Sequence, residues 1–166
     1  MNYFLKIKKA YPPTRRGFLM VEVLVAVSII SVSILGAMAV TQKSVYISRQ
    51  AVHANQATFL LEEGAEIVRI LRDTNWSNVS GLTAGTIYYP IFTGGAWTLS
   101  TTPNTVGIFT RKVVISNVNR DNTTKDISIT GTNDPLTKLF TITVFWSEGG
   151  VTITKTLPFY IIDIFS

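Results

Sequence analysis

A single acidic residue, Glu22, lies inside an apolar run, residues 18–40, that is otherwise free of charge. The run follows directly after Arg15, Arg16 and Gly17. A carboxylate in lipid is costly unless an opposite charge compensates it, so an acidic residue inside a membrane helix indicates a functional site. The chemistry that Glu22 can offer is therefore the binding of a cation at the level of a membrane.

The apolar run has the length of one membrane crossing. Its 23 residues would extend about 34 Å as a helix, against about 30 Å for a hydrocarbon core. Two other interpretations stay open. One is a secretory signal peptide, because residues 37–39 have the small-x-small form that signal peptidase accepts. The other is an ordinary single-pass anchor in which Glu22 stays hydrated at the interface.

The positive charge of the chain is concentrated before Gly17. The formal net charge is +5, and the side chains after Gly17 sum to zero. A basic segment beside an apolar helix stays in the cytoplasm, so we expect the rest of the chain in the periplasm or outside the cell. A neutral remainder predicts no nucleic-acid partner, although Arg111, Lys112, Arg120, Lys125 and Lys138 could gather on one face.

The order Arg15, Arg16, Gly17, Phe18, followed by Glu22 and the apolar run, resembles the class III signal sequence of type IV prepilins and type II secretion pseudopilins. In that family a prepilin peptidase cuts after the glycine, and the new first residue is N-methylated. The resemblance implies a leader over residues 1–17, cleavage between Gly17 and Phe18, and methylation of Phe18. Glu22 then matches the family's acid at the fifth mature position.

Cleavage would expose a cationic amine on Phe18 at the depth of Glu22, and each charge lowers the cost of holding the other in lipid. In the family, this acid is thought to pair with the amine of a neighbouring subunit and to set axial register. The implied partners are the prepilin peptidase, other pilin or pseudopilin subunits, and the inner-membrane assembly platform.

One long helix is expected from Phe18 to about Arg72, because no proline occurs between Pro13 and Pro90. Residues 18–40 form its transmembrane half and residues 41–73 its amphipathic half. The polar side of the second half carries Glu66 and Arg69 at i,i+3 spacing. Steps of three and four define the predicted core-facing stripe: Ile47, Ala51, Ala54, Ala57, Leu60, Gly64, Ile67 and Leu71.

The family resemblance covers residues 15–73, and residues 60–73 (LLEEGAEIVRILRD) are similar to the helix end of minor pilins and I-type pseudopilins. Many major pilins carry a proline in the membrane half of this helix, whereas this chain has Gly36 as its only flexible point there. The chain also has no cysteine, unlike the disulfide-closed major pilins. The lack of cysteine favours a minor pilin or a pseudopilin.

Period-two alternation predicts an antiparallel sheet over residues 74–166. Strands are expected at 86–92, 96–100, 109–118 and 126–130. A hairpin is expected from 140–146 to 151–154 across a four-residue loop, with Pro158 marking an edge strand or a bulged continuation. We expect a meander whose apolar face packs on the helix stripe and whose threonine-rich face points outward.

Catalytic and metal-binding chemistry finds little support in the sequence. His53 is the only histidine and has neither cysteine nor a nearby carboxylate cluster, so neither a metal site nor a Ser-His-Asp triad is expected. Asp121, Asp126 and Asp134 lie among turn-forming residues, with calcium ligation as the less favoured interpretation. We expect no catalytic residue and no cofactor. Core or sheet-surface packing is expected for the three tryptophans, Trp76, Trp97 and Trp146.

The sequence thus predicts an α+β pilin fold, with a long N-terminal helix packed on a C-terminal antiparallel sheet. The leading hypothesis is a structural, non-enzymatic filament subunit that is inserted in the plasma membrane and then incorporated into a pilus or pseudopilus. The alternative is a single-pass, membrane-anchored β-rich binding module that forms no filament.

Overall fold

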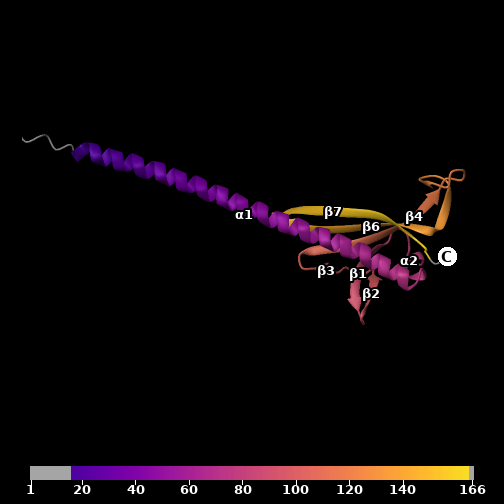
Figure 1. Cartoon of the computed structure of the whole chain (residues 1–166). Helices are drawn as coiled ribbons and strands as arrows, with labels where there is room; N and C mark the ends of the chain where they lie inside the picture. Colours follow the sequence, from indigo (N-terminus) through magenta and orange to yellow (C-terminus); the bar gives the residue numbers. More distant parts are fainter. Residues whose placement is uncertain (1–15, 165–166) are drawn as a thin grey trace, which may run out of the picture. The chain divides into compact units, whose positions relative to one another are not determined.

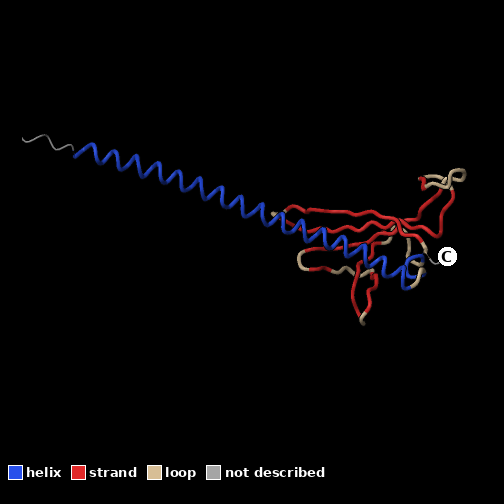
Figure 2. Tube along the Cα trace, viewed as in Figure 1, coloured by secondary structure: helices blue, strands red, loops and turns tan. Residues whose placement is uncertain are grey.

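The computed structural model describes the backbone of residues 16–164 and the side chains of residues 19–164. It shows the predicted α+β architecture, with a long helix packed on an antiparallel sheet (Figures 1 and 2). Residues 1–15 of the expected leader lie outside the described residues. The elements are α1 (Arg16–Thr74), α2 (Ser77–Ser80), β1 (Ile87–Thr93), β2 (Ala96–Ser100), β3 (Thr105–Val106), β4 (Phe109–Arg120), β5 (Ile127–Ser128), β6 (Thr132–Glu148) and β7 (Val151–Ile162).

Helix α1 is 59 residues long and agrees with the predicted extent at both ends to within about two residues. It ends in a polar segment in which side chains begin to hydrogen-bond with the backbone. Asn75 N–H still donates to the Leu71 carbonyl, and the Asn75 side chain then accepts from the Ser77 N–H as α2 begins. The chain divides into two compact units, Met1–Ser48 and Arg49–Ser166. In the first unit, residues 16–48 are entirely helical.

The second unit contains one sheet of order β2-β1-β4-β6-β7, with all neighbours antiparallel. The predicted meander is wrong in one respect. Strand β1, and not β2, pairs with β4, so the β1–β2 hairpin points its second strand away from the rest of the sheet. Strand β7 is an edge strand whose register continues through Pro158, opposite Thr141, and the bulged alternative is therefore wrong.

The β6–β7 turn is tighter than predicted. Ser147 pairs with Thr152 and Glu148 with Val151, which leaves a loop of two residues, Gly149 and Gly150. Both have positive φ angles, 60° and 81°, and a two-residue hairpin turn with this conformation favours glycine at both positions. The sequence predicts a four-residue loop because a glutamate before two glycines is typical of a loop. In the structure the Glu148 side chain is buried and the residue belongs to β6.

The core lies between α1 and one face of the sheet. Ala57, Ile67 and Leu71 are buried as predicted, and Gly64 packs where an added Cβ would come within 2.9 Å of Ile142 Cγ2. The predicted stripe is wrong at Ile47 and Ala51, which are exposed, because the sheet contacts α1 from about the turn of His53 and Ala54. The remaining large buried side chains of the core include Leu61, Val68, Val113, Ile115, Phe140, Ile142, Val144 and Trp146.

Candidate membrane and assembly site

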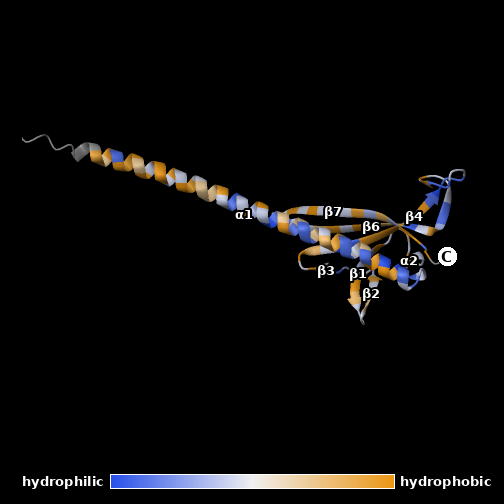
Figure 3. Cartoon of the chain, in the orientation of Figure 1, coloured by the Kyte–Doolittle hydropathy of each residue, from blue (hydrophilic) through white to orange (hydrophobic). Residues whose placement is uncertain are grey.

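The first half of α1 exposes almost all of its apolar surface. Large apolar side chains from Leu19 to Val40 are more than half exposed, for example Leu24 at 65% and Ile29 at 63%. The most apolar 18-residue window of the helix has a mean hydropathy of 2.6, and none of it is buried. Figure 3 shows this half predominantly in hydrophobic colours, whereas the second half mixes hydrophobic and hydrophilic residues. By length and composition, α1 can span a membrane once.

Three of the polar side chains in this half are satisfied within the helix. Ser28, Ser31 and Ser33 each donate a hydrogen bond from their hydroxyl to the carbonyl four residues earlier, at 2.7 to 2.8 Å. Such bonds remove the need for water, because both the hydroxyl proton and a lone pair of the carbonyl find partners inside the helix. The serines can therefore enter lipid without an external partner.

Glu22 differs from these serines. Its side chain is exposed on α1, and it forms no hydrogen bond or ion pair with any side chain of residues 19–164. In water an exposed carboxylate needs no partner, but in a membrane it requires a cation or a proton. Glu22 is thus the polar group of the apolar half for which the described chain offers no compensation.

The predicted processing site lies at the first turn of α1. The helix begins at Arg16, so the backbone from Gly17 to Phe18 is helical. An amine created on Phe18 would lie four residues, about one helical turn, before Glu22. Arg15 lies outside the described residues, and the side chains of Arg16 and Phe18 are outside the described part as well.

The second half of α1 contacts the sheet through a buried charge. Arg111 of β4 is 3% exposed, and its Nη1 lies 2.6 Å from Glu63 Oε2 on α1. The same nitrogen donates to the Leu60 carbonyl, and the guanidinium lies over the Trp97 ring. In the sequence Arg111 was grouped with a possible basic patch, but β4 turns it inward, toward the helix. A period-two count from Phe109 through Val113 places it on the inward face.

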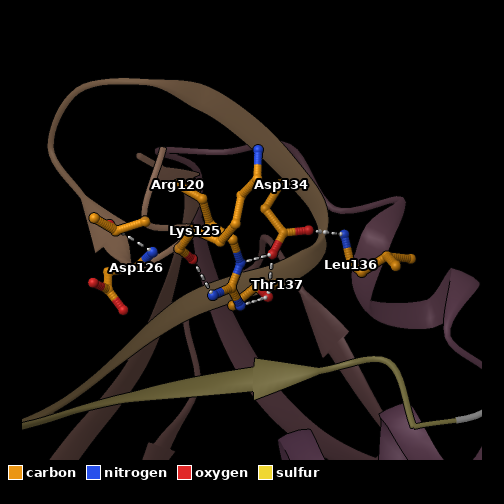
Figure 4. A network of polar contacts seen from close by, with 7 residues as sticks. Arg120, Lys125, Asp126, Asp134, Leu136 and Thr137 are labelled. Atoms are coloured by element: carbon orange, nitrogen blue, oxygen red, sulfur yellow. Dashed lines mark hydrogen bonds and ion pairs between the residues drawn. The ribbon is translucent and has the colours of Figure 1, made fainter. Parts of the chain in front are cut away.

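Two more cations of the possible basic patch also pair with side chains of the sheet domain. Arg120 forms an ion pair with Asp134, with 2.6 Å between Nε and Oδ2, and Lys138 donates to the side chain of Asn117. Arg120 further donates to the Lys125 carbonyl and to Thr137 Oγ1 (Figure 4). These contacts join the two ends of the segment between β4 and β6, residues 121–131, which we call the excursion between β4 and β6.

Two aspartates at the ends of this segment, Asp121 and Asp134, accept hydrogen bonds from neighbouring residues. Thr137 and Arg120 hold the pKa of Asp134 below its usual range by hydrogen bonding to the carboxylate. The N–H groups of Thr124 and Thr123 do the same for the pKa of Asp121. No group of three or more His, Asp or Glu side chains suited to a metal ion occurs among the described residues.

His53 has a carboxylate partner that the sequence did not reveal. Glu148, at the end of β6, places Oε1 3.4 Å from His53 Nδ1. The two residues are 95 positions apart in the sequence, and only the register of β6 on the sheet brings them together. The tryptophans follow the prediction: Trp146 is buried, and Trp76 and Trp97 pack against the core.

Comparisons of the chain with protein-family models, with curated proteins and with solved structures found no match.

Proposed function

We propose that this chain is a structural subunit, a minor pilin or pseudopilin, of a type IV pilus or type II secretion-like filament. A prepilin peptidase removes residues 1–17, Phe18 is N-methylated, and α1 anchors the subunit in the plasma membrane. The sheet domain then lies outside the cytoplasm. Assembly draws the subunit from the membrane into the filament through contacts between long helices, with the inner-membrane assembly platform and other subunits as partners.

The observation that carries this proposal is the isolation of Glu22. The serines of the apolar half are satisfied within α1, whereas Glu22 has no partner among the described side chains. In a membrane helix such a carboxylate needs a proton or a cation from elsewhere. The amine of a processed Phe18, on the same chain or on a neighbour, is a cation at the right depth.

The architecture supports the same proposal. The apolar half of α1 has exposed side chains all around, which suits lipid before assembly and neighbouring helices after it. Small residues such as Ala26 and Gly36 permit close approach of such helices, and nothing lies within 4 Å of the Cβ position of Gly36. The second half packs on the sheet, so a subunit that is drawn by its helix brings the sheet domain with it.

Mass spectrometry of the protein purified from membranes of its host tests the processing step. We expect a first residue of N-methylated Phe18. An intact Met1, or cleavage near residue 39, would contradict the proposal and leave an anchored or exported β-rich domain.

The exchange Glu22→Ala tests assembly separately from processing. In this variant the amine of processed Phe18 has no carboxylate to compensate it. An uncompensated charge in lipid costs on the order of 2.5 to 3.5 kcal/mol, so we expect at least about tenfold less variant than wild type in sheared filaments. Membrane insertion and cleavage should stay close to wild type. The matched control is Ser28→Ala, which removes a polar group already satisfied by the Leu24 carbonyl and should assemble normally. Equal incorporation of Glu22→Ala would refute the proposed role.

A further inference from the structure

A buried carboxylate lies in the folded domain, at the contact between α1 and the end of β6. The side chain of Glu148 is 6% exposed. Its Oε2 accepts a hydrogen bond from Trp146 Nε1 at 3.1 Å, and its Oε1 faces His53 Nδ1 at 3.4 Å. We call His53, Trp146 and Glu148 the His53 cluster.

The two facing atoms of the cluster need a proton between them. Both His53 Nδ1 and Glu148 Oε1 are buried without a hydrogen-bond partner. An imidazole nitrogen without a proton and a carboxylate oxygen are both acceptors, so they would repel each other at this distance. A proton on Nδ1 places a positive hydrogen between the two acceptors and removes their repulsion. The geometry therefore favours the Nδ1–H tautomer of His53.

We infer that His53 and Glu148 form a proton-sharing contact that makes the packing of α1 on the β6–β7 hairpin sensitive to pH. In the neutral state, the Nδ1 proton lies between the ring and the carboxylate. When the ring takes up a second proton on Nε2, it becomes a cation beside a buried anion, and the contact gains a charge attraction. Protonation of the ring therefore strengthens the contact, which we expect to be stronger in mildly acidic surroundings than at pH 8.

Two cations of the sheet near this turn of α1 bind other groups, and Arg49, one turn earlier on α1, is exposed. Lys155 of β7 donates to the Ala54 carbonyl and to Thr58 Oγ1. Arg111 of β4 pairs with Glu63. The ring of Phe109 meets the imidazole edge-on, with 6.2 Å between the centroids. Glu148 is thus the charged group in contact with the imidazole, and the sign of the pH effect follows from that pair.

The position of His53 gives the ring access to protons. Its side chain is 22% exposed and lines a groove of about 670 Å³ that also includes Phe59, Ile108 and Phe109. Nε2 can therefore exchange protons with solvent while Nδ1 stays inside. A domain that faces the periplasm or the medium would meet changes in pH directly. The inference itself concerns the folded chain and holds whether or not the chain forms filaments.

Nitrogen-15 NMR of the full chain in detergent micelles tests the tautomer, and a preparation without a polyhistidine tag contains a single imidazole because His53 is the only histidine. At pH 8 we expect the nitrogen shifts of the Nδ1–H form. The Nε2–H form would overturn the inference.

Thermal unfolding of the same protein tests the pH effect. The variant His53→Asn places an amide donor near the position of Nδ1 but does not titrate. We expect the unfolding equilibrium constant of wild type, relative to His53→Asn, to fall about three- to tenfold between pH 8 and pH 5.5, as for a partly buried charge pair. Glu148→Gln should abolish this gain in the wild-type histidine background. Identical pH dependence of wild type and His53→Asn would overturn the inference.

Discussion

The two halves of α1 use apolar side chains in opposite ways. From Leu19 to Val40, residues such as Leu24 and Ile29 are more than half exposed. From Ala57 to Leu71, residues such as Ile67 and Val68 are almost fully buried against the sheet. The backbone is the same regular helix in both halves. What differs is whether the chain itself supplies the surface that covers the helix.

This difference separates the surface of α1 that the sheet covers from the surface that the described chain leaves exposed. The second half finds its apolar and charged partners on β4, β6 and β7. Among the described residues of the first half, the serine hydroxyls have hydrogen-bond partners and the large apolar side chains stay exposed. Substitutions in the second half should therefore change the stability of the domain, and those in the first half should not; under the proposed function they would act on membrane and filament behaviour instead.

The largest stability effect is expected for Phe140→Ala. Phe140 is fully buried and stacks on Phe159, and removal of a buried phenylalanine side chain costs about 3 to 5 kcal/mol. The matched control is Ile29→Ala, at an exposed apolar position of the first half. Chemical denaturation of the full chain in detergent, followed by near-UV circular dichroism, should show a large loss for the first variant alone. Similar losses for both would contradict the division into two halves.

Two glutamates of α1 give the next contrast. Glu63→Ala leaves the buried guanidinium of Arg111 without its carboxylate, at a cost of about 1 to 3 kcal/mol. Glu66→Ala removes an exposed ion pair with Arg69, worth about 0.5 kcal/mol or less. Denaturation midpoints of the two variants provide the measurement. If Glu66→Ala destabilises the domain as strongly as Glu63→Ala, burial of Arg111 is not what gives the contact its strength.

Glycine-to-alanine exchanges compare the halves directly. At Gly64 an added Cβ would meet Ile142 Cγ2 at 2.9 Å and Arg111 Cδ at 3.3 Å. Overpacking costs about 1 to 3 kcal/mol, which outweighs the gain of about 1 kcal/mol from alanine in a helix. We expect Gly64→Ala to lower the melting temperature. Gly36→Ala meets nothing within 4 Å and should leave the melting temperature unchanged or raise it.

The smallest expected effect is a pH dependence of stability that comes from Asp134. Because its hydrogen bonds lower the pKa of Asp134 in the folded state, the carboxylate stabilises the fold above its unfolded pKa. That stabilisation is lost as the pH falls through the lower folded pKa. The difference in melting temperature between wild type and Asp134→Asn should therefore be constant from pH 7 to pH 5 and shrink below about pH 4. A difference that grows on acidification would contradict this assignment.

The helix and much of the sheet could be predicted because their signals are local. Absence of proline and a period of three to four residues fix α1, and alternation gives β2 and most of β4. The first eight of the 17 residues of β6, 132–139, escaped prediction because most of them are polar and their pairing with β4 depends on a bulge between Asn117 and Val118. Such a strand is stabilised by its neighbour and not by its own pattern.

The contacts of the domain could be predicted less well than its elements. Alternation placed Trp146 inward, and the same count continued by two residues would have placed Glu148 beside it, but a glutamate before two glycines has the composition of a loop. Its contact with His53 also depends on how the sheet lies across α1, which no local pattern specifies. No partner of Glu22 lies among the described side chains, so its pairing with a processed Phe18 amine stays a prediction.

The two-glycine turn between β6 and β7 has a consequence for how the domain tolerates insertions. Side chains alternate between the two sides of a strand, so lengthening the turn by a single residue and sliding β7 by one position would exchange its sides. Lys155 would then point to solvent, and Thr154 or Thr156 would face α1 in its place. Variation in length is therefore better accommodated at the tip of the excursion between β4 and β6, where Ile129 is 97% exposed.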